Sequence, residues 1–196
     1  MRDAHPGDPQ TPLPRPPLGP HEGPGSGNAE PAHAPGGARP SPLARLAAAV
    51  LPVVAASVLG QVATYPNIES WYAGLTKASF NPPDWVFAPV WTALFALMAF
   101  AVWRILRLPA DRPGRTTALA AFFVQLALNA TWPWMFFAAR NPPLGLANIV
   151  VQLAAILVAI ALFRRLDRAA AWLLVPLAAW VAFAALLNLA VWRLNG

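Results

Sequence analysis

The chain has 196 residues, no cysteine and a formal net charge of +6. The lack of cysteine excludes disulfides, thiolate metal sites and cysteine nucleophiles. Hydrophobic residues make up 57% of the sequence and charged residues only 11%, whereas soluble domains carry roughly 25% charged residues, so the composition indicates a membrane protein. The basic residues lie between apolar runs instead of gathering on one solvated face, which argues against nucleic-acid binding.

Residues 1–42 are predicted to form a disordered Pro- and Gly-rich tail. Residues 1–40 contain eleven Pro and seven Gly and few large apolar side chains. Such a segment cannot bury enough apolar surface to offset the entropy lost on ordering. Residues 12–17 (PLPRPP) fit a polyproline ligand, but a solvated tail is the simpler interpretation. No apolar core follows Met1 and Arg2, so no secretory signal is expected.

Residues 43–196 are predicted to be an all-α membrane domain, a bundle of five transmembrane helices. The apolar segments are Leu43 to Thr64, Trp85 to Trp103, Thr116 to Ala139, Leu144 to Phe163 and Ala169 to Trp192. Each has 19 to 24 residues, and about 20 helical residues cross a hydrocarbon core of ~30 Å. Prolines lie in or near these segments, so helix kinks are expected. They are Pro52, Pro89, Pro133 and Pro176.

The placement of basic residues predicts the orientation in the membrane. One side carries Arg39, Arg45, Arg104, Arg107, Arg112, Arg115, Arg164, Arg165 and Arg168, and the other carries only Lys77, Arg140 and Arg193. By the positive-inside rule, the N-terminus is expected in the cytoplasm and the C-terminus across a cell inner membrane.

The longest connection, residues 65–84, is predicted to be a folded lid. Loops of this length in compact domains are usually functional or disordered. This loop has apolar surface to pack, in Trp71, Tyr72, Leu75 and Phe80, and it holds Lys77, the only lysine in the chain. Together with the following helix, it is expected to enclose a pocket for a flat lipophilic ligand.

Aromatic and amide side chains recur along the expected helices at a spacing of three or four residues. These rows contain Phe87, Trp91 and Phe95; Gln125, Asn129, Trp132 and Phe136; Asn148 and Gln152; and Trp172, Pro176, Trp180, Ala184, Asn188 and Trp192. Residues at this spacing share a helix face. Unpaired amides are costly in a membrane, so these faces should point into the bundle. Aromatic walls with a few amides suit a planar, largely apolar ligand.

Structural roles stay open for several of these residues. Trp85, Trp103 and Trp192 lie at segment ends, which is typical of interfacial aromatic belts. Trp91, Trp132 and Trp180 lie deeper and fit packing or ligand contact equally well. Asn129 and Asn188 can hydrogen-bond between helices, and Ala56, Gly60 and Thr64 form a small-residue row suited to close helix packing. The three histidines are in the tail, so no metal site or serine triad is expected in the membrane domain.

Over residues 43–195 the sequence resembles the tryptophan-rich sensory protein/translocator protein family, also called the peripheral benzodiazepine receptor family. Three ordered blocks carry the resemblance. They contain Trp71, Tyr72, Leu75, Lys77, Pro82, Pro83, Phe87 and Pro89 to Trp91; Asn129, Trp132, Phe136 and Phe137; and Pro176, Trp180, Phe183, Ala184, Asn188, Trp192 and Arg193. The chain departs from the family pattern at Ala78, at Pro133-Trp134 and at Leu177. It also lacks the tyrosine of the cholesterol motif between Leu189 and Arg193.

The resemblance implies a homodimeric five-helix bundle in the lipid bilayer that binds tetrapyrroles such as protoporphyrin IX and haem, without a metal site of its own. Isoquinoline and benzodiazepine drugs are further ligands of the family. The implied ligand-binding residues are Trp71, Tyr72, Trp91, Phe95, Asn129, Trp132, Trp180 and Ala184, and the implied lid residues are Leu75, Lys77, Pro82 and Pro83.

The function expected from this resemblance is that of a membrane receptor or carrier for tetrapyrroles, in porphyrin transport or stress-linked sensing, and not of an enzyme. One alternative is light- and oxygen-dependent porphyrin degradation, in which Trp91 would be the reactive indole. Another is a general small-molecule transporter. Two observations argue against this last alternative: no intramembrane charge marks an ion path, and no inverted repeat is evident.

Overall fold

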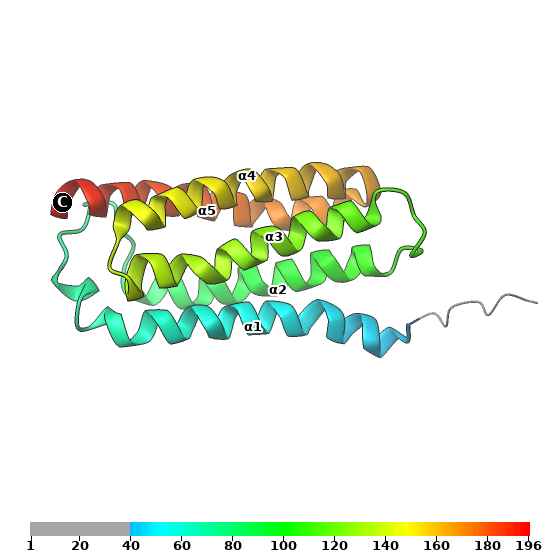
Figure 1. Ribbon diagram of the computed structural model, residues 1–196, viewed down its shortest axis with the longest axis horizontal. Helices are drawn as coiled ribbons and strands as arrows, with labels where there is room; N and C mark the ends of the chain where they lie inside the picture. Colours follow the sequence, from blue (N-terminus) through cyan, green and yellow to red (C-terminus); the bar gives the residue numbers. More distant parts are fainter. Residues whose placement is uncertain (1–39) are drawn as a thin grey trace, which may run out of the picture. The chain divides into compact units, whose positions relative to one another are not determined.

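The computed structural model describes residues 40–196, and the predicted disorder of residues 1–39 lies outside this range. Five long helices follow one another: α1 (Pro42–Ile68), α2 (Phe87–Leu106), α3 (Arg115–Pro133), α4 (Pro142–Leu166) and α5 (Arg168–Asn195) (Figure 1). No strand occurs within residues 40–196. All five helices are long and apolar enough to cross a membrane, which confirms the predicted fold class.

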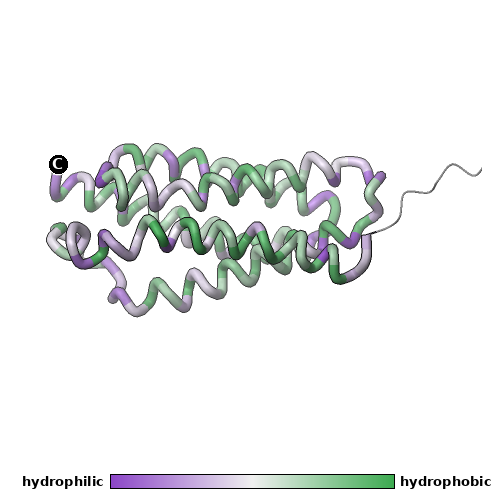
Figure 2. The backbone as a smooth tube through the Cα atoms, turned by 60° about the horizontal axis from the view of Figure 1, so that its bottom comes forward, coloured by the Kyte–Doolittle hydropathy of each residue, from purple (hydrophilic) through white to green (hydrophobic). Residues whose placement is uncertain are grey.

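The helices pack as a ring in the order α2, α1, α3, α4 and α5, and α5 lies beside α2 again. Hydrophobic residues cover the middle of the helices, and hydrophilic residues gather at the helix ends and connections (Figure 2). This distribution is what a hydrocarbon layer with two polar boundaries requires.

Helix ends differ from the sequence-based expectation mainly at α1, which continues beyond Thr64 to Ile68. Pro66 lies in this last turn and lacks an N–H group, but two side chains satisfy carbonyls there. Asn67 donates to the carbonyl of Ala63 at 3.0 Å, and Ser70 donates to the carbonyl of Pro66 at 2.9 Å. The connection to α2 is therefore shorter than expected and comprises residues 69–86, with short 3₁₀ turns at Tyr72–Gly74 and Asp84–Val86.

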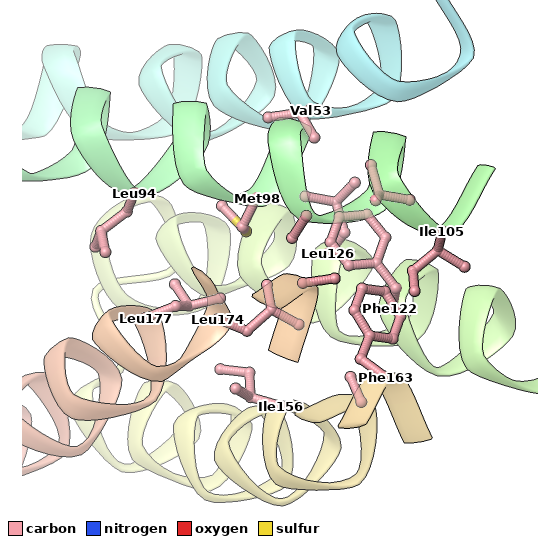
Figure 3. Close-up of a cluster of buried hydrophobic side chains, with 14 of the residues drawn as sticks. Val53, Leu94, Met98, Ile105, Phe122, Leu126, Ile156, Phe163, Leu174 and Leu177 are labelled. Carbon is pink, nitrogen blue, oxygen red and sulfur yellow. The ribbon is translucent and has the colours of Figure 1, made fainter. Parts of the chain in front are cut away.

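The core of the bundle is built from large apolar side chains of all five helices (Figure 3). Phe122 on α3 and Phe163 on α4 are fully buried, and their rings stack with centroids 6.0 Å apart. Met98 on α2 and Leu174 on α5 are also fully buried. Because lipid is as apolar as these side chains, close packing holds such helices together.

Polar contacts fasten one end of the bundle, where α2 ends and α5 begins. Arg104 Nε donates to Asp167 Oδ2 at 2.8 Å, and the N–H of Ala170 donates to Asp167 Oδ1 at 3.1 Å. Asp167 thus caps α5 and pairs with α2. Burial of the Asp167 carboxyl raises its pKa. The hydrogen bond and the positive charge of Arg104, together with hydrogen bonds from backbone N–H groups, lower the pKa by more, so it lies below the ordinary value.

The kink expected at Pro133 takes the form of a change in helix type. After Pro133, residues Trp134–Ala138 form a π-helical turn, in which the N–H of Ala139 donates to the carbonyl of Trp134 at 2.8 Å. A π turn rotates side chains relative to an α-helix and is often found at functional positions. Here it buries the adjacent residues Phe136 and Phe137 together, at 3% and 8% exposure.

Candidate functional site

A cavity of about 1190 Å³ lies among the helices and is lined by side chains of all five and by Tyr72 of the loop. Its wall follows α1 from Leu46 to Ile68 and α2 from Phe87 to Trp103. The aromatic lining residues are Tyr65, Tyr72, Phe87, Trp91, Phe95, Phe100, Trp103, Trp132, Phe136, Phe137 and Trp180. Among the described residues that line the cavity, Asp84 is the only charged one. The interior is therefore large, aromatic and almost uncharged.

Seven of the eight residues proposed from the sequence as ligand-binding lie on this wall. They are Tyr72, Trp91, Phe95, Asn129, Trp132, Trp180 and Ala184. The proposed lid residues Leu75, Lys77, Pro82 and Pro83 do not line the cavity, and neither does the eighth ligand-binding candidate, Trp71. The structure therefore brings the helix residues together on the wall, whereas Tyr72 is the one proposed loop residue that lines the cavity.

Trp71 and Tyr72 attach the loop to the π-helical turn. The Trp71 ring meets Phe136 edge-on with centroids 5.5 Å apart, and the Tyr72 ring meets Phe137 edge-on at 5.5 Å. Leu75 packs against the same buried group. Trp71 thus packs against Phe136 and Phe137, which line the cavity, and does not line it itself.

The other loop residues fix the path of the chain. The Lys77 ammonium lies 4.5 Å from the centroid of the Tyr72 ring, a cation–π contact. Asn81 donates to the carbonyl of Pro82 at 2.9 Å, and Pro83 precedes the 3₁₀ turn that leads into α2. The loop also contacts α5, where Phe80 lies 6.5 Å from Phe183 between ring centroids. These contacts position Tyr72 at the cavity.

Tyr72 is the loop group whose acidity is changed. Burial raises the pKa of its phenol, the Asp84 carboxylate raises it further, and a hydrogen bond with Asn81 opposes both effects. Tyr72 and Asp84 both line the cavity. The phenol therefore keeps its proton to a higher pH than a free tyrosine.

Aromatic pairs build the walls. Phe87 on α2 meets Trp180 on α5 edge-on, with centroids 5.8 Å apart. On α2, Trp91 and Phe95 are tilted against each other at 5.6 Å, and in the third span Trp132 stacks on Phe136 at 5.1 Å. Such pairs favour offset or edge-on geometry and hold each other's orientation. The walls are thus set before any ligand arrives.

The amide rows reach different surroundings. Asn148 donates to Thr131 Oγ1 at 3.1 Å and so joins α4 to α3, while the Gln125 amide points at Met98 Sδ at 3.7 Å. Gln152 and Asn188 line the cavity instead, although the sequence-based site set omits them. The sequence did carry a signal for them, because Gln152 follows Asn148 and Asn188 follows Ala184 at a spacing of four residues. This spacing places each on the inward face of its helix.

One of two further rows departs from the expectation, and the other agrees with it. Trp172 is 72% exposed, although it was grouped with Trp180 and Asn188, because each step of four residues turns an α-helix by about 40° beyond a full turn. The small-residue row of α1 packs inside the bundle. A Cβ on Gly60 would lie 3.3 Å from Pro133 Cγ, so this row serves the contact between α1 and α3, in line with close helix packing.

Within residues 40–196, no group of three or more His, Cys, Asp or Glu side chains is arranged to hold a metal ion. The chemistry that the described cavity offers is stacking on indole and phenyl rings, together with hydrogen bonding by amides, hydroxyls and indole N–H groups. Such a lining suits a flat lipophile, and the described lining residues form no acid–base or nucleophilic constellation.

Comparison with known proteins agrees with this architecture. Residues 48–193 match the TspO/MBR family. The chain is 39% identical over 131 residues to the tryptophan-rich protein TspO of Chlorobaculum tepidum, covering 66% of this chain and 83% of that one. It is 35% identical over 152 residues to the TspO protein of Archaeoglobus fulgidus, covering 77% and 97%. It is 38% identical over 126 residues to the translocator protein of Sus scrofa, covering 64% and 75%.

Proposed function

Because this chain belongs to the TspO/MBR family and is a multi-pass membrane protein, we propose that it binds tetrapyrroles such as protoporphyrin IX or haem, and other flat lipophiles, as a membrane receptor or carrier. The observation that supports this most is the cavity of about 1190 Å³ with Trp91, Trp132 and Trp180 on its wall.

The size and lining of the cavity suit a macrocycle. Ligand sites usually have volumes of ~300–1,000 Å³ and a mostly apolar lining, and this cavity, at about 1190 Å³, is slightly larger than that range. Each aromatic contact contributes ~0.5–1.5 kcal/mol beyond area burial. Several such contacts plus burial can supply the ~8 kcal/mol of micromolar binding. Trp91 on α2 and Trp132 on α3 offer ring faces from two helices.

The residues present fit a metal-free ring better than an iron porphyrin. Histidine, cysteine and methionine are common axial ligands of haem iron, and none of them is among the described residues that line the cavity. Iron would add no strong bond to these walls unless a tyrosine such as Tyr72 supplied one. Protoporphyrin IX is therefore the first ligand to test.

The test is an absorbance titration of protoporphyrin IX with the purified protein in detergent, in the dark. Wild type should give a saturable shift of the porphyrin band, and Trp91→Ala should weaken binding about tenfold through the lost stacking and burial. Trp134→Ala is the matched control, because Trp134 is 45% exposed and does not line the cavity. Equal affinity of all three proteins would remove Trp91 from the site.

A second candidate function is light- and oxygen-dependent porphyrin degradation, which the position of Trp91 on the cavity wall favours. Excited porphyrin passes energy to O₂, and the activated oxygen adds to the Trp91 indole as a peroxide. The peroxide then transfers oxygen to the neighbouring porphyrin ring, which is oxidised and loses its absorbance. Illumination in air should then bleach the porphyrin band faster with wild type than with Trp91→Phe, and exclusion of oxygen should abolish the difference. Bleaching at the same rate in Trp91→Phe would reject this role.

We also propose that the protein lies in a cell inner membrane. By the positive-inside rule, the arginine-rich ends of its helices are then on the cytoplasmic side. The absence of cysteine makes this easy to test. The Lys77→Cys variant should react with an impermeant maleimide added outside the cell. The Arg112→Cys variant should react only after the membrane has been opened. The reverse pattern would invert the orientation.

A further inference from the structure

The cavity has two parts that differ in how many helices enclose it. At the loop end of the bundle it is a chamber with lining residues from all five helices. At the other end, where α1 begins and α2 ends, the described lining residues come from α1 and α2 alone, because α3 contributes none before Asn129, α4 none after Gln152 and α5 none before Trp180. This second part is the α1–α2 groove, and its walls include Leu46, Val50 and Val54 on α1, and Ala96, Phe100 and Trp103 on α2.

The α1–α2 groove is open on its outer side. Leu46 and Val54 are 47% and 50% exposed, and Phe100 on the facing helix is 46% exposed, although all three line the cavity. Val53 also lines the cavity and is buried, which gives the groove a closed inner side. Exposed side chains in the span of a membrane bundle meet hydrocarbon chains and not water. The groove therefore opens toward the acyl chains of the bilayer.

The length and the lining of the groove suit one acyl chain. Leu46 and Val54 are eight residues apart in the sequence, which corresponds to ~12 Å along a helix, and one leaflet contributes about half of the ~30 Å hydrocarbon core. The lining residues are apolar over this length, and the first polar ones, Ser57 on α1 and Thr92 on α2, come only beyond it. A lipid chain that enters from the arginine-rich end would thus lie against apolar side chains throughout its leaflet.

The groove ends beside an arginine that has no acidic partner among residues 40–196. Arg104 is paired with Asp167 at 2.8 Å, and Arg115 donates to the last carbonyls of α2 at 3.2 Å. Arg107 forms no salt bridge within the described part of the chain. It is exposed, and its guanidinium carbon lies 4.7 Å from the centroid of the Trp103 ring, a cation–π contact. A cation is thus held against the last residue of the groove wall.

We propose that the α1–α2 groove binds one anionic phospholipid, with an acyl chain between the two helices and the phosphate at Arg107. Arginine can hold a phosphate group through two parallel hydrogen bonds, and basic groups beside membrane helices attract anionic headgroups. A zwitterionic lipid offers the same chains and a phosphate but no net negative charge, so it binds more weakly. This lipid site lies beyond the chamber proposed for tetrapyrroles and does not rest on tetrapyrrole binding.

Native mass spectrometry of the full chain in mild detergent tests the headgroup contact. The protein is mixed with equal amounts of phosphatidylglycerol and phosphatidylcholine that carry identical acyl chains. Wild type should retain one phosphatidylglycerol in preference to phosphatidylcholine, and Arg107→Gln should reduce this preference about fivefold. Arg164→Gln is the matched control, because Arg164 is an exposed arginine at the same end of the bundle but on α4, which packs between α3 and α5. An equal reduction in both variants would mean diffuse attraction by the arginines and would overturn the site.

A second pair of variants tests the acyl chain in the same experiment. Ala96→Phe places a ring in the groove and should lower the retention of both lipids several-fold. Ala93→Phe adds the same ring at an exposed position of α2 that does not line the cavity, so it should retain lipid as wild type does. Helix content measured by circular dichroism checks that both variants are folded. Equal lipid retention in the two variants, or no preference for phosphatidylglycerol in wild type, would contradict the proposal.

Discussion

The side chain of Asn195 holds both backbone polar groups of Thr76. Asn195 Oδ1 accepts from the Thr76 N–H at 2.8 Å, and Nδ2 donates to the Thr76 carbonyl at 2.9 Å. The same Nδ2 donates to the carbonyl of Val191 at 2.8 Å, which fixes the amide on α5. The end of α5 thus carries a clasp for the loop of residues 69–86, and the two segments lie side by side in Figure 1.

Removing this clasp should loosen the loop while leaving the bundle folded. In Asn195→Ala, the Thr76 amide should exchange its hydrogen several-fold faster, and porphyrin should dissociate faster, because exposed hydrogen bonds of this kind contribute only ~1 kcal/mol each. Hydrogen exchange followed by mass spectrometry measures the first effect. The neighbouring variant Arg193→Ala is the control, and identical loop exchange in both variants would show that the clasp does not restrain the loop.

Gly145→Ala should destabilise the protein. The added Cβ would lie 2.8 Å from Asn188 Nδ2 and 3.2 Å from Phe136, so packed side chains must shift. Overpacking of this kind costs ~1–3 kcal/mol, partly offset by the better helix propensity of alanine. Gly74→Ala is the control, because no atom lies within 4 Å of its added Cβ. Unfolding in detergent compares the two, and equal stability would mean that the α4–α5 contact is looser than described.

The Arg104–Asp167 contact should make stability depend on acid pH. The pKa of Asp167 is lower in the folded chain than its ordinary value, so the stabilisation is complete above the ordinary carboxyl pKa and is lost as the pH falls through the folded value. Asp167→Asn keeps a cap for α5 and removes the charge. Because Arg104 is 34% exposed, solvent screening limits the loss at neutral pH to ~1 kcal/mol or less.

Chemical unfolding of wild type and Asp167→Asn at several pH values measures this dependence. The difference in unfolding free energy between the two proteins should be greatest at neutral pH and vanish in acid. A difference that stays constant over the whole pH range would show that the charge of Asp167 does not contribute.

The phenol of Tyr72 should ionise at higher pH than free tyrosine, because burial and the Asp84 carboxylate both raise its pKa. The chain has only two tyrosines, so the near-ultraviolet absorbance of tyrosinate in a Tyr65→Phe background reports Tyr72 alone. Asp84→Asn should lower the pKa of Tyr72 relative to the parent but leave it raised, since burial remains. If Tyr72 ionises at the same pH as a free tyrosine derivative, its phenol is not buried as described.

The sequence predicted the architecture because its strongest signals are lengths and spacings. Runs of 19 to 24 apolar residues have the length of a membrane-spanning helix. Trp91, Trp132 and Trp180 recur at helical spacing with other large side chains, and all three line the cavity. The end of α1 was misplaced, because Pro66 reads as a helix stop and the side-chain bonds of Asn67 and Ser70 are not visible in a pattern.

Other parts of the site depend on contacts that no local pattern contains. The π turn after Pro133, which contains the buried neighbours Phe136 and Phe137, interrupts the regular α-helical spacing on which the sequence pattern depends. Phe136 in that turn contacts Trp71 of the loop. The clasp between Thr76 and Asn195 joins residues 119 positions apart.

The most direct test of porphyrin binding is a titration of the tryptophan fluorescence of the wild-type protein with protoporphyrin IX, in detergent and in the dark. Binding in the cavity predicts strong quenching that saturates at one porphyrin per chain, because Trp91, Trp132 and Trp180 all lie on its wall. Quenching that grows linearly with porphyrin and never saturates would mean that the porphyrin only partitions into micelles, and it would contradict the proposed function.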